Sequence, residues 1–330
     1  MAQLQSTSIT GSLITSGSAI TLPQLASNQS SSFASVGSIF YNSTTNSLNY
    51  KRCLPAWSAN NAMIVARYYS AGAGTNTAAL AFGGAGPSGP VGACTEAYNG
   101  SSWTAGGAMI TARYLLAGAG TNTTTLAFGG IAPSGRVACT EAYNGSSWST
   151  GGALSTARYG LAGAGASNTA ALAFGGLVTP ASVACTEAYN GTSWTAGGAM
   201  ITARLYLAGA GATNTAALAF GGYISGGGGV VACTEAYNGT SWTAGGAMIN
   251  TKYLFAGAGT QTAALAFGGL PASTSTEAYN GTSWSSGGAM IVARYGLAGA
   301  GTNTAALAFG GIGNGVIVAC TENYSTVGTL

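Results

Sequence analysis

Six glutamates and six basic residues recur at fixed places in a sequence that carries little other charge. Each glutamate stands in Thr-Glu-Ala-Tyr or Thr-Glu-Asn-Tyr, and each basic residue follows a tryptophan by ten positions. Each of the first five glutamates also precedes its basic partner by 17 positions. The acids are Glu96, Glu141, Glu187, Glu235, Glu277 and Glu322, and the bases are Arg67, Arg113, Arg158, Arg204, Lys252 and Arg294.

Two interpretations of these charges are open. A ring of glutamates could serve catalysis or bind a cation, but a single glutamate on a strand is a poor cation site, because such ions need several oxygens at once. We favour six structural ion pairs, placed where the chain crosses from one repeat to the next. Loss of one partner would then leave a buried charge, at a cost of about 3 kcal/mol.

Much enzyme chemistry is excluded by residues that the sequence lacks. It has no His, and its six acidic residues are all glutamates of the repeat, so no Ser-His-Asp or Cys-His set can form. A histidine metal cluster is excluded for the same reason. The sequence therefore predicts a non-enzymatic protein with no catalytic residues, no metal and no cofactor.

Five of the six cysteines share one position of the repeat, just before Thr-Glu-Ala-Tyr or its variant. They are Cys94, Cys139, Cys185, Cys233 and Cys320, and the remaining unit has Ser275 there. Equivalent positions in adjacent units lie beyond the roughly 7 Å Cα limit for a disulfide. We expect buried free thiols, with Cys53 near Thr326 and also unpaired.

The repeat itself identifies the elements that position these residues. Six tryptophans and six Phe-Gly-Gly motifs recur at about 46-residue intervals over residues 57–324. Asn-Gly between Tyr and Trp predicts a type I′ hairpin turn, and the glycine-rich LAGAG segment is too glycine-rich for a stable helix. Each unit then holds four strands, LAGAG, TAALAF, VACTEAY and SSWTAGG from innermost to outermost. Four short strands per unit indicate a β-propeller blade.

The unit resembles the kelch repeat in its double glycine, its tyrosine, a tryptophan about five residues later and a basic residue ten further on. The match covers about 270 residues, although the stretch after the double glycine is short and neutral here. The resemblance implies an all-β, six-bladed propeller with a binding role and fixes no ligand.

The two ends of the repeat region complement each other. Residues 317–324 supply a third strand without a following tryptophan, and the segment around Trp57 supplies a fourth strand without a preceding third. We expect the N-terminal strand to complete the C-terminal blade and close the ring. In a two-residue hairpin Tyr98 would face Ser101 and Glu96 would face Trp103, and by the same register Glu322 would face Trp57.

The units differ mainly in the stretch between each Phe-Gly-Gly and the next third strand, which we call the variable loops. They are residues 85–93, 131–138, 177–184, 223–232, 270–275 and 312–319. Loops on a rigid scaffold often carry binding, whereas neutral drift would produce the same variation. The candidate binding residues are Pro87, Ser88, Pro133, Arg136, Thr179, Tyr223, Ile224, Pro271 and Asn314.

Residues 1–50 are rich in Ser, Thr and Asn, and we expect an extended attachment or oligomerisation segment preceding a propeller over residues 51–330. The stretch VGSIFYNSTTNSLNY resembles a segment of bacteriophage tail-fibre and other virion proteins that leads into a head domain, and MAQLQSTSITGSL is similar to cyanophage virion proteins. The sequence contains no recognisable secretion signal and no apolar run long enough for a membrane span.

These observations favour a phage virion protein, a tail-fibre or other appendage or decoration protein whose propeller displays loops for a host receptor or glycan. The partners expected are other virion proteins through residues 1–50, with several copies on the particle. A net charge of +3 with dispersed bases predicts no nucleic-acid partner, and none is expected in a membrane. The alternatives are a bacterial kelch-like protein-binding module and, third, a propeller enzyme.

Overall fold

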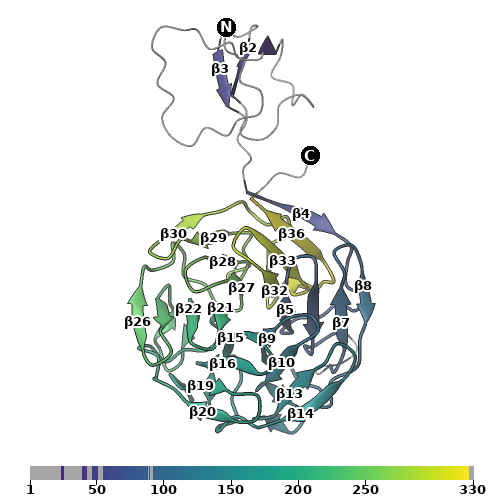
Figure 1. The fold of residues 1–330 in the computed structure, drawn as a ribbon, viewed down its shortest axis with the longest axis vertical. Helices are drawn as coiled ribbons and strands as arrows, with labels where there is room; N and C mark the ends of the chain where they lie inside the picture. The colour runs from purple at the N-terminus through teal and green to yellow at the C-terminus, as the bar shows by residue number, and fades with distance from the viewer. Residues whose placement is uncertain are drawn as a thin grey trace. The chain divides into compact units, whose positions relative to one another are not determined.

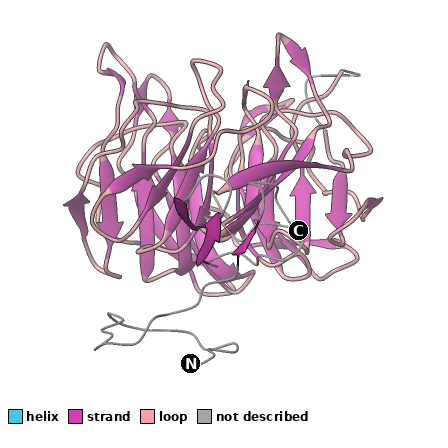
Figure 2. Cartoon of the chain, turned by 90° about the horizontal axis from the view of Figure 1, so that it is seen from above, coloured by secondary structure: helices cyan, strands magenta, loops and turns pink. Residues whose placement is uncertain are grey.

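The computed structural model describes residues 24–25, 39–42, 47–50, 55–87, 89 and 92–326, and all regular elements among them are β-strands. Figure 2 accordingly shows only strands and loops in the described part of the chain. Contacts divide the chain into Met1–Leu54 with Val327–Leu330, and Pro55–Thr326. The rest of the predicted extended segment within residues 1–50 lies outside the described residues.

The first unit contains a three-stranded sheet, and two of its strands lie within the stretch VGSIFYNSTTNSLNY. It comprises β1 (Gln24–Leu25), β2 (Ile39–Asn42) and β3 (Ser47–Tyr50). β1 is parallel to β2, and β2 is antiparallel to β3.

The second unit is built from repeated four-stranded antiparallel sheets, which we number 1 to 6 and list from the innermost strand outward. Sheet 1 is β5 (Ala71–Gly74), β6 (Ala79–Phe82), β7 (Thr95–Tyr98) and β8 (Trp103–Ala105). Sheet 2 is β9 (Ala117–Gly120), β10 (Thr125–Phe128), β13 (Thr140–Tyr143) and β14 (Trp148–Gly151). Sheet 3 is β15 (Ala162–Ser167), β16 (Ala170–Phe174), β19 (Thr186–Tyr189) and β20 (Trp194–Ala196).

The remaining sheets repeat this order, except that sheet 6 takes its outermost strand from the N-terminal side of the unit. Sheet 4 is β21 (Ala208–Thr213), β22 (Ala216–Phe220), β25 (Thr234–Tyr237) and β26 (Trp242–Gly245). Sheet 5 is β27 (Ala256–Gly259), β28 (Ala264–Phe267), β29 (Thr276–Tyr279) and β30 (Trp284–Ser286). Sheet 6 is β32 (Ala298–Gly301), β33 (Ala305–Phe309), β36 (Thr321–Ser325) and β4 (Ala56–Asn60). This arrangement is consistent with propeller blades and stands around a common centre in Figure 1.

The variable loops contain short strands that the sequence did not predict. Three of the loops each form a two-stranded ribbon. A fourth loop, the last in the chain, also forms a ribbon, which Arg294–Tyr295 from outside the loop extends to three strands. The strands are β11 (Ile131–Ala132), β12 (Gly135–Arg136), β17 (Leu177–Val178), β18 (Ala181–Ser182), β23 (Tyr223–Ile224), β24 (Gly229–Val230), β31 (Arg294–Tyr295), β34 (Ile312–Gly313) and β35 (Val316–Ile317). The variable loops are therefore partly ordered by strand pairing.

Glycine in the innermost strands allows neighbouring sheets to approach closely. A Cβ atom on Gly72 of β5 would lie 2.6 Å from the carbonyl oxygen of Gly299 on β32. No side chain fits in that space without moving backbone, so the alternating Ala-Gly pattern follows from the convergence of the sheets.

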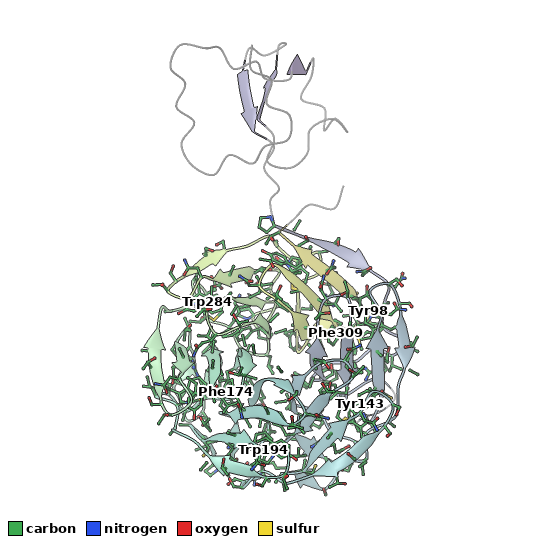
Figure 3. The ribbon with its side chains drawn as sticks, in the orientation of Figure 1. Tyr98, Tyr143, Phe174, Trp194, Trp284 and Phe309 are labelled. Carbon is green, nitrogen blue, oxygen red and sulfur yellow. The ribbon has the colours of Figure 1, made fainter. Side chains whose placement is uncertain are left out.

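The apolar core lies between adjacent sheets, and each tryptophan has the same place in it. Trp103 of sheet 1 packs against Phe309 of sheet 6, with ring centroids 5.1 Å apart, and against Tyr98 of its own sheet. Its indole Nε1 donates a hydrogen bond to Thr321 Oγ1 of sheet 6 at 3.0 Å. All six tryptophans donate in this way to the threonine of Thr-Glu-Ala/Asn-Tyr in the preceding sheet. Figure 3 labels members of this core, including Phe174, Trp194, Trp284 and Phe309.

The predicted register of the outer hairpins is wrong by two residues. Tyr98 pairs with Trp103 and Glu96 with Ala105, while Trp57 pairs with Tyr324 rather than with Glu322. The turn is not of type I′, because Asn99 does not adopt a positive φ. Its side-chain Oδ1 instead accepts hydrogen bonds from the amides of Ser101 and Ser102, which makes a four-residue loop.

Candidate functional site

The variable loops meet the crossing segments, which run from the outermost strand of one sheet to the innermost strand of the next. The residue after each basic residue forms a bridge or ribbon with the start of a variable loop. Tyr114, for example, bridges Ile131, and Leu205 bridges Tyr223. The two sets of segments therefore form one surface, which we call the loop face.

An ion pair lies beneath each crossing segment. The pairs are Arg67–Glu96, Arg113–Glu141 (3.2 Å), Arg158–Glu187 (3.0 Å), Arg204–Glu235 (3.1 Å), Lys252–Glu277 (3.0 Å) and Arg294–Glu322 (2.9 Å). All twelve side chains are buried, with at most 3% of their surface exposed. The structure thus brings every repeat glutamate together with a basic residue ten positions after a tryptophan.

The partner of each base is not the glutamate 17 residues before it. Arg113 lies near the C-terminal end of the crossing into sheet 2 and pairs with Glu141 of that sheet, not with Glu96. The chain direction explains this, because a crossing segment delivers its base to the sheet that it enters, whereas the preceding glutamate belongs to the sheet that it leaves.

The carboxylates also hold the crossing segments through backbone amides. Glu141 accepts hydrogen bonds from the amides of Ile110 (2.7 Å) and Thr111 (3.1 Å) in addition to its ion pair with Arg113. Burial lowers the pKa of Arg113, while Cys139 and Glu141 act to raise it. The oxygens of Glu141 are thus engaged in fixing the chain, and the geometry is that of a structural anchor.

The repeat cysteines are not buried as predicted. Cys94 and Cys185 are exposed, Cys139, Cys233 and Cys320 are half-buried, and all five are free thiols. Cys53 lies outside the described residues. A basic side chain of the crossing segment lies against the thiol in sheet 4, where Arg204 Nη1 contacts Cys233 Sγ at 2.7 Å. Among the described residues no three His, Cys, Asp or Glu side chains are grouped so that they could hold a metal ion.

A continuous cycle of backbone hydrogen bonds surrounds the centre of the loop face. The second residue after each base donates its amide to the carbonyl of the equivalent residue of the preceding crossing segment, at 2.7–3.1 Å. The six members are Tyr69, Leu115, Gly160, Tyr206, Leu254 and Gly296, and the amide of Tyr69 returns to Gly296. We call this group the axial ring. All six have a positive φ of 53–63°.

The axial ring breaks the six-fold pattern of the chain into a two-fold one. Its residues run Tyr, Leu, Gly and then again Tyr, Leu, Gly. The two tyrosines lie against the two glycines: a Cβ on Gly160 would lie 2.8 Å from Tyr206 Cδ1, and one on Gly296 would lie 2.8 Å from Tyr69 Cδ1. The glycines are therefore needed for both their positive φ and the space that they leave.

Further tyrosines surround the axial ring. The preceding residue of each crossing segment is tyrosine in five of six cases, namely Tyr68, Tyr114, Tyr159, Tyr253 and Tyr295. Tyr69 stacks on Tyr114 at a centroid distance of 6.4 Å, and Tyr206 lies 6.3 Å from both Tyr159 and Tyr253. We call these seven side chains the tyrosine collar. All of them are partly exposed.

The collar hydroxyls are close enough to influence one another. Burial raises the pKa of Tyr69 to about 12, with further contributions from Tyr295, Tyr68, Tyr253 and Tyr114. The pKa of Tyr206 is raised for the same main reason, with contributions from Tyr159 and Tyr69. The hydroxyls of Tyr69 and Tyr206 are therefore neutral at physiological pH and can act as hydrogen-bond donors and acceptors.

A small hollow lies inside the collar and has a volume of about 90 Å³. The residues of the axial ring line it, together with the next residue of each crossing segment. That next residue is Leu or Phe in five cases and Ser70 in the sixth. Ser70 is 8% exposed, and its hydroxyl has no hydrogen-bond partner.

The predicted loop residues lie further out on the loop face. Exposed ones are Pro87, Pro133, Arg136, Thr179, Pro271 and Asn314. Tyr223 and Ile224 are half-buried, and Tyr223 reaches the collar, with its ring centroid 5.8 Å from that of Tyr253. Ser88 lies outside the described residues. Two adjacent loops are joined by a hydrogen bond from the amide of Ser182 to Ser225 Oγ (2.7 Å).

Sequence reasoning missed the tyrosine collar and Ser70, although a signal was present. The variable loops differ in length, which the sequence shows directly, whereas the crossing segments keep one length and differ in residue type. The alternation Tyr, Leu, Gly at the second position after each repeat Arg or Lys was the informative feature.

No family model matches the chain, and no curated protein matches it either. Within the described part of the chain, no helix is long and apolar enough to span a membrane.

Proposed function

We propose that this chain is a non-enzymatic virion structural protein of a bacteriophage, a tail-fibre or other appendage protein with a binding head. The head is a six-bladed, kelch-like propeller that β4 closes by completing the sheet of β32, β33 and β36. Its loop face binds a host receptor or glycan, and residues 1–50 attach it to other virion proteins.

The observation that carries the binding role is the chemistry of the loop face. The six repeat ion pairs are buried, so the face presents tyrosines, glycines, prolines and small polar residues, with Arg136 as an exposed charge. Such a surface recognises a partner by shape, stacking and neutral hydrogen bonds. Binding should therefore depend little on salt.

The pairing of β4 with β36 supports the closed ring, because it joins residues such as Ser58 and Asn323, which are 265 positions apart. The cycle of the axial ring supports it independently, because its hydrogen bonds pass through all six crossing segments and return to the first.

Mass spectrometry of purified phage particles tests the virion assignment, since the chain should be found in them in several copies. Its absence from particles would favour a bacterial kelch-like binding module. Exchange of the variable loops for those of a related propeller tests recognition. Adsorption to host cells should fall, and unchanged adsorption would show that another virion protein reads the receptor.

A further inference from the structure

We infer that the tyrosine collar is a carbohydrate-binding site, and that a neutral oligosaccharide lies across it with one sugar hydroxyl reaching Ser70. This inference rests on the proposed function and names the class of ligand and the place where it binds.

The first argument is the departure from the repeat. Core positions of the units are nearly identical, whereas the six positions of the axial ring carry three different residue types, although all six share the same positive φ. Tyr69 and Tyr206 occupy opposite units of six, at a left-handed φ that a tyrosine rarely adopts. Leu115, Leu254, Gly160 and Gly296 fill the same backbone position elsewhere in the ring.

The second argument is Ser70, which is independent of the tyrosines. Its hydroxyl is more than nine-tenths buried, lines the hollow and has no hydrogen-bond partner. A buried polar group without a partner is costly, and the equivalent positions carry Leu116, Leu161, Leu207, Phe255 and Leu297. A serine there indicates that a hydroxyl is needed to meet a ligand.

The third argument concerns the class of that ligand. The hollow of about 90 Å³ is much smaller than a typical enclosed ligand pocket of roughly 300 Å³ or more, so the ligand must lie on the surface and insert only one small group. Tyrosine rings offer flat apolar faces together with neutral hydroxyls. The C–H face and the hydroxyls of a pyranose match this combination, and two tyrosines on opposite sides of the centre suit a chain of sugars that crosses it.

Saturation-transfer NMR on the full-length protein tests the site with four neutral hexasaccharides: maltohexaose, cellohexaose, laminarihexaose and mannohexaose. Hexagalacturonic acid serves as the charged comparison. We expect saturation transfer to at least one of the four neutral hexasaccharides. We expect no transfer to hexagalacturonic acid. Transfer to none of the four, or equal transfer to the charged one, would overturn the inference.

Variants taken from the chain's own repeats locate the site without disturbing the fold. Ser70→Leu installs the residue of four other units and fills the hollow, and Tyr69→Leu with Tyr206→Leu installs the residue of units two and five. Each should weaken binding at least about tenfold, because each removes a stacking ring or the insertion point. Ile110→Ser is the matched control, since Ser155 occupies that exposed position in the next crossing segment.

Oligosaccharide binding that survives both Ser70→Leu and the paired Tyr69→Leu and Tyr206→Leu changes would refute the site. A chain that is present in virions and required for adsorption, but binds no probe sugar, would overturn this inference and leave the proposed function standing.

Discussion

Replacement of Glu141 by alanine should lower the stability of the propeller unit substantially. The substitution leaves the Arg113 guanidinium buried and unpaired, and it removes the acceptor for the amides of Ile110 and Thr111. Breaking a buried ion pair costs about 3–5 kcal/mol. Because a domain of about 270 residues loses roughly 2 °C in melting temperature per kcal/mol, we expect a decrease of about 6–10 °C.

Differential scanning calorimetry or circular dichroism measures this shift, with two comparisons that isolate its cause. Arg136→Ala removes an exposed arginine and should change the free energy of unfolding by less than about 0.5 kcal/mol. Arg113→Met combined with Glu141→Leu removes both charges and should be less destabilising than Glu141→Ala alone. A melting temperature for Glu141→Ala within 1 °C of the parent would refute the anchoring role of the carboxylate.

Three further predictions concern the thiols, the collar and the axial ring. A thiol assay on the denatured, unreduced chain should count six free cysteines, and a count below six would reveal a disulfide. In the native chain Cys94 and Cys185 should react first, because they are exposed. Burial raises the pKa of Tyr69 to about 12, so folding favours the neutral form of this side chain. Its contribution to stability is therefore intact below pH 10 and is lost as the pH rises through 12. Ultraviolet titration should show a late-ionising tyrosine, and complete titration of all tyrosines near pH 10 would contradict the burial argument. Leu115→Val should lower the free energy of unfolding by about 1–2 kcal/mol, since a β-branched residue resists the positive φ of this position. Leu115→Gly should be tolerated, because glycine adopts a positive φ readily. Equal melting temperatures for the two variants would disprove backbone strain at Leu115.

The repeated sheets could be predicted from the sequence because their signals are local. Tryptophan spacing, glycine-rich inner segments and the mismatched ends of the repeat are all visible in the chain. The register was wrong because it depended on how one side chain, that of Asn99, satisfies the amides of its own loop. A two-residue and a four-residue loop can share the Asn-Gly sequence, so the hydrogen bonds decide between them.

The candidate site was predictable only in part. Variation in loop length pointed to the loop face but not to its centre, because the collar arises from six crossing segments that meet only in three dimensions. Exposure of the cysteines could not be predicted either, since the repeat position alone does not show whether a thiol meets solvent or a side chain such as that of Arg204. Residues that break a repeat by type, such as Ser70, are the signal that a single repetitive sequence can still provide.

The pairing of β4 with β36 has a consequence for synthesis of the protein. Ser58 emerges from the ribosome 265 residues before its partner Asn323, which at about 5–20 residues per second amounts to a delay of roughly 13–50 s. During that time β4 has no partner strand. When β36 has emerged, it can pair with the β4 strand of a neighbouring nascent chain instead of its own. Dense production of many copies would favour such exchange, so yield of the correctly paired sheet 6 should improve when elongation is fast and nascent chains are far apart.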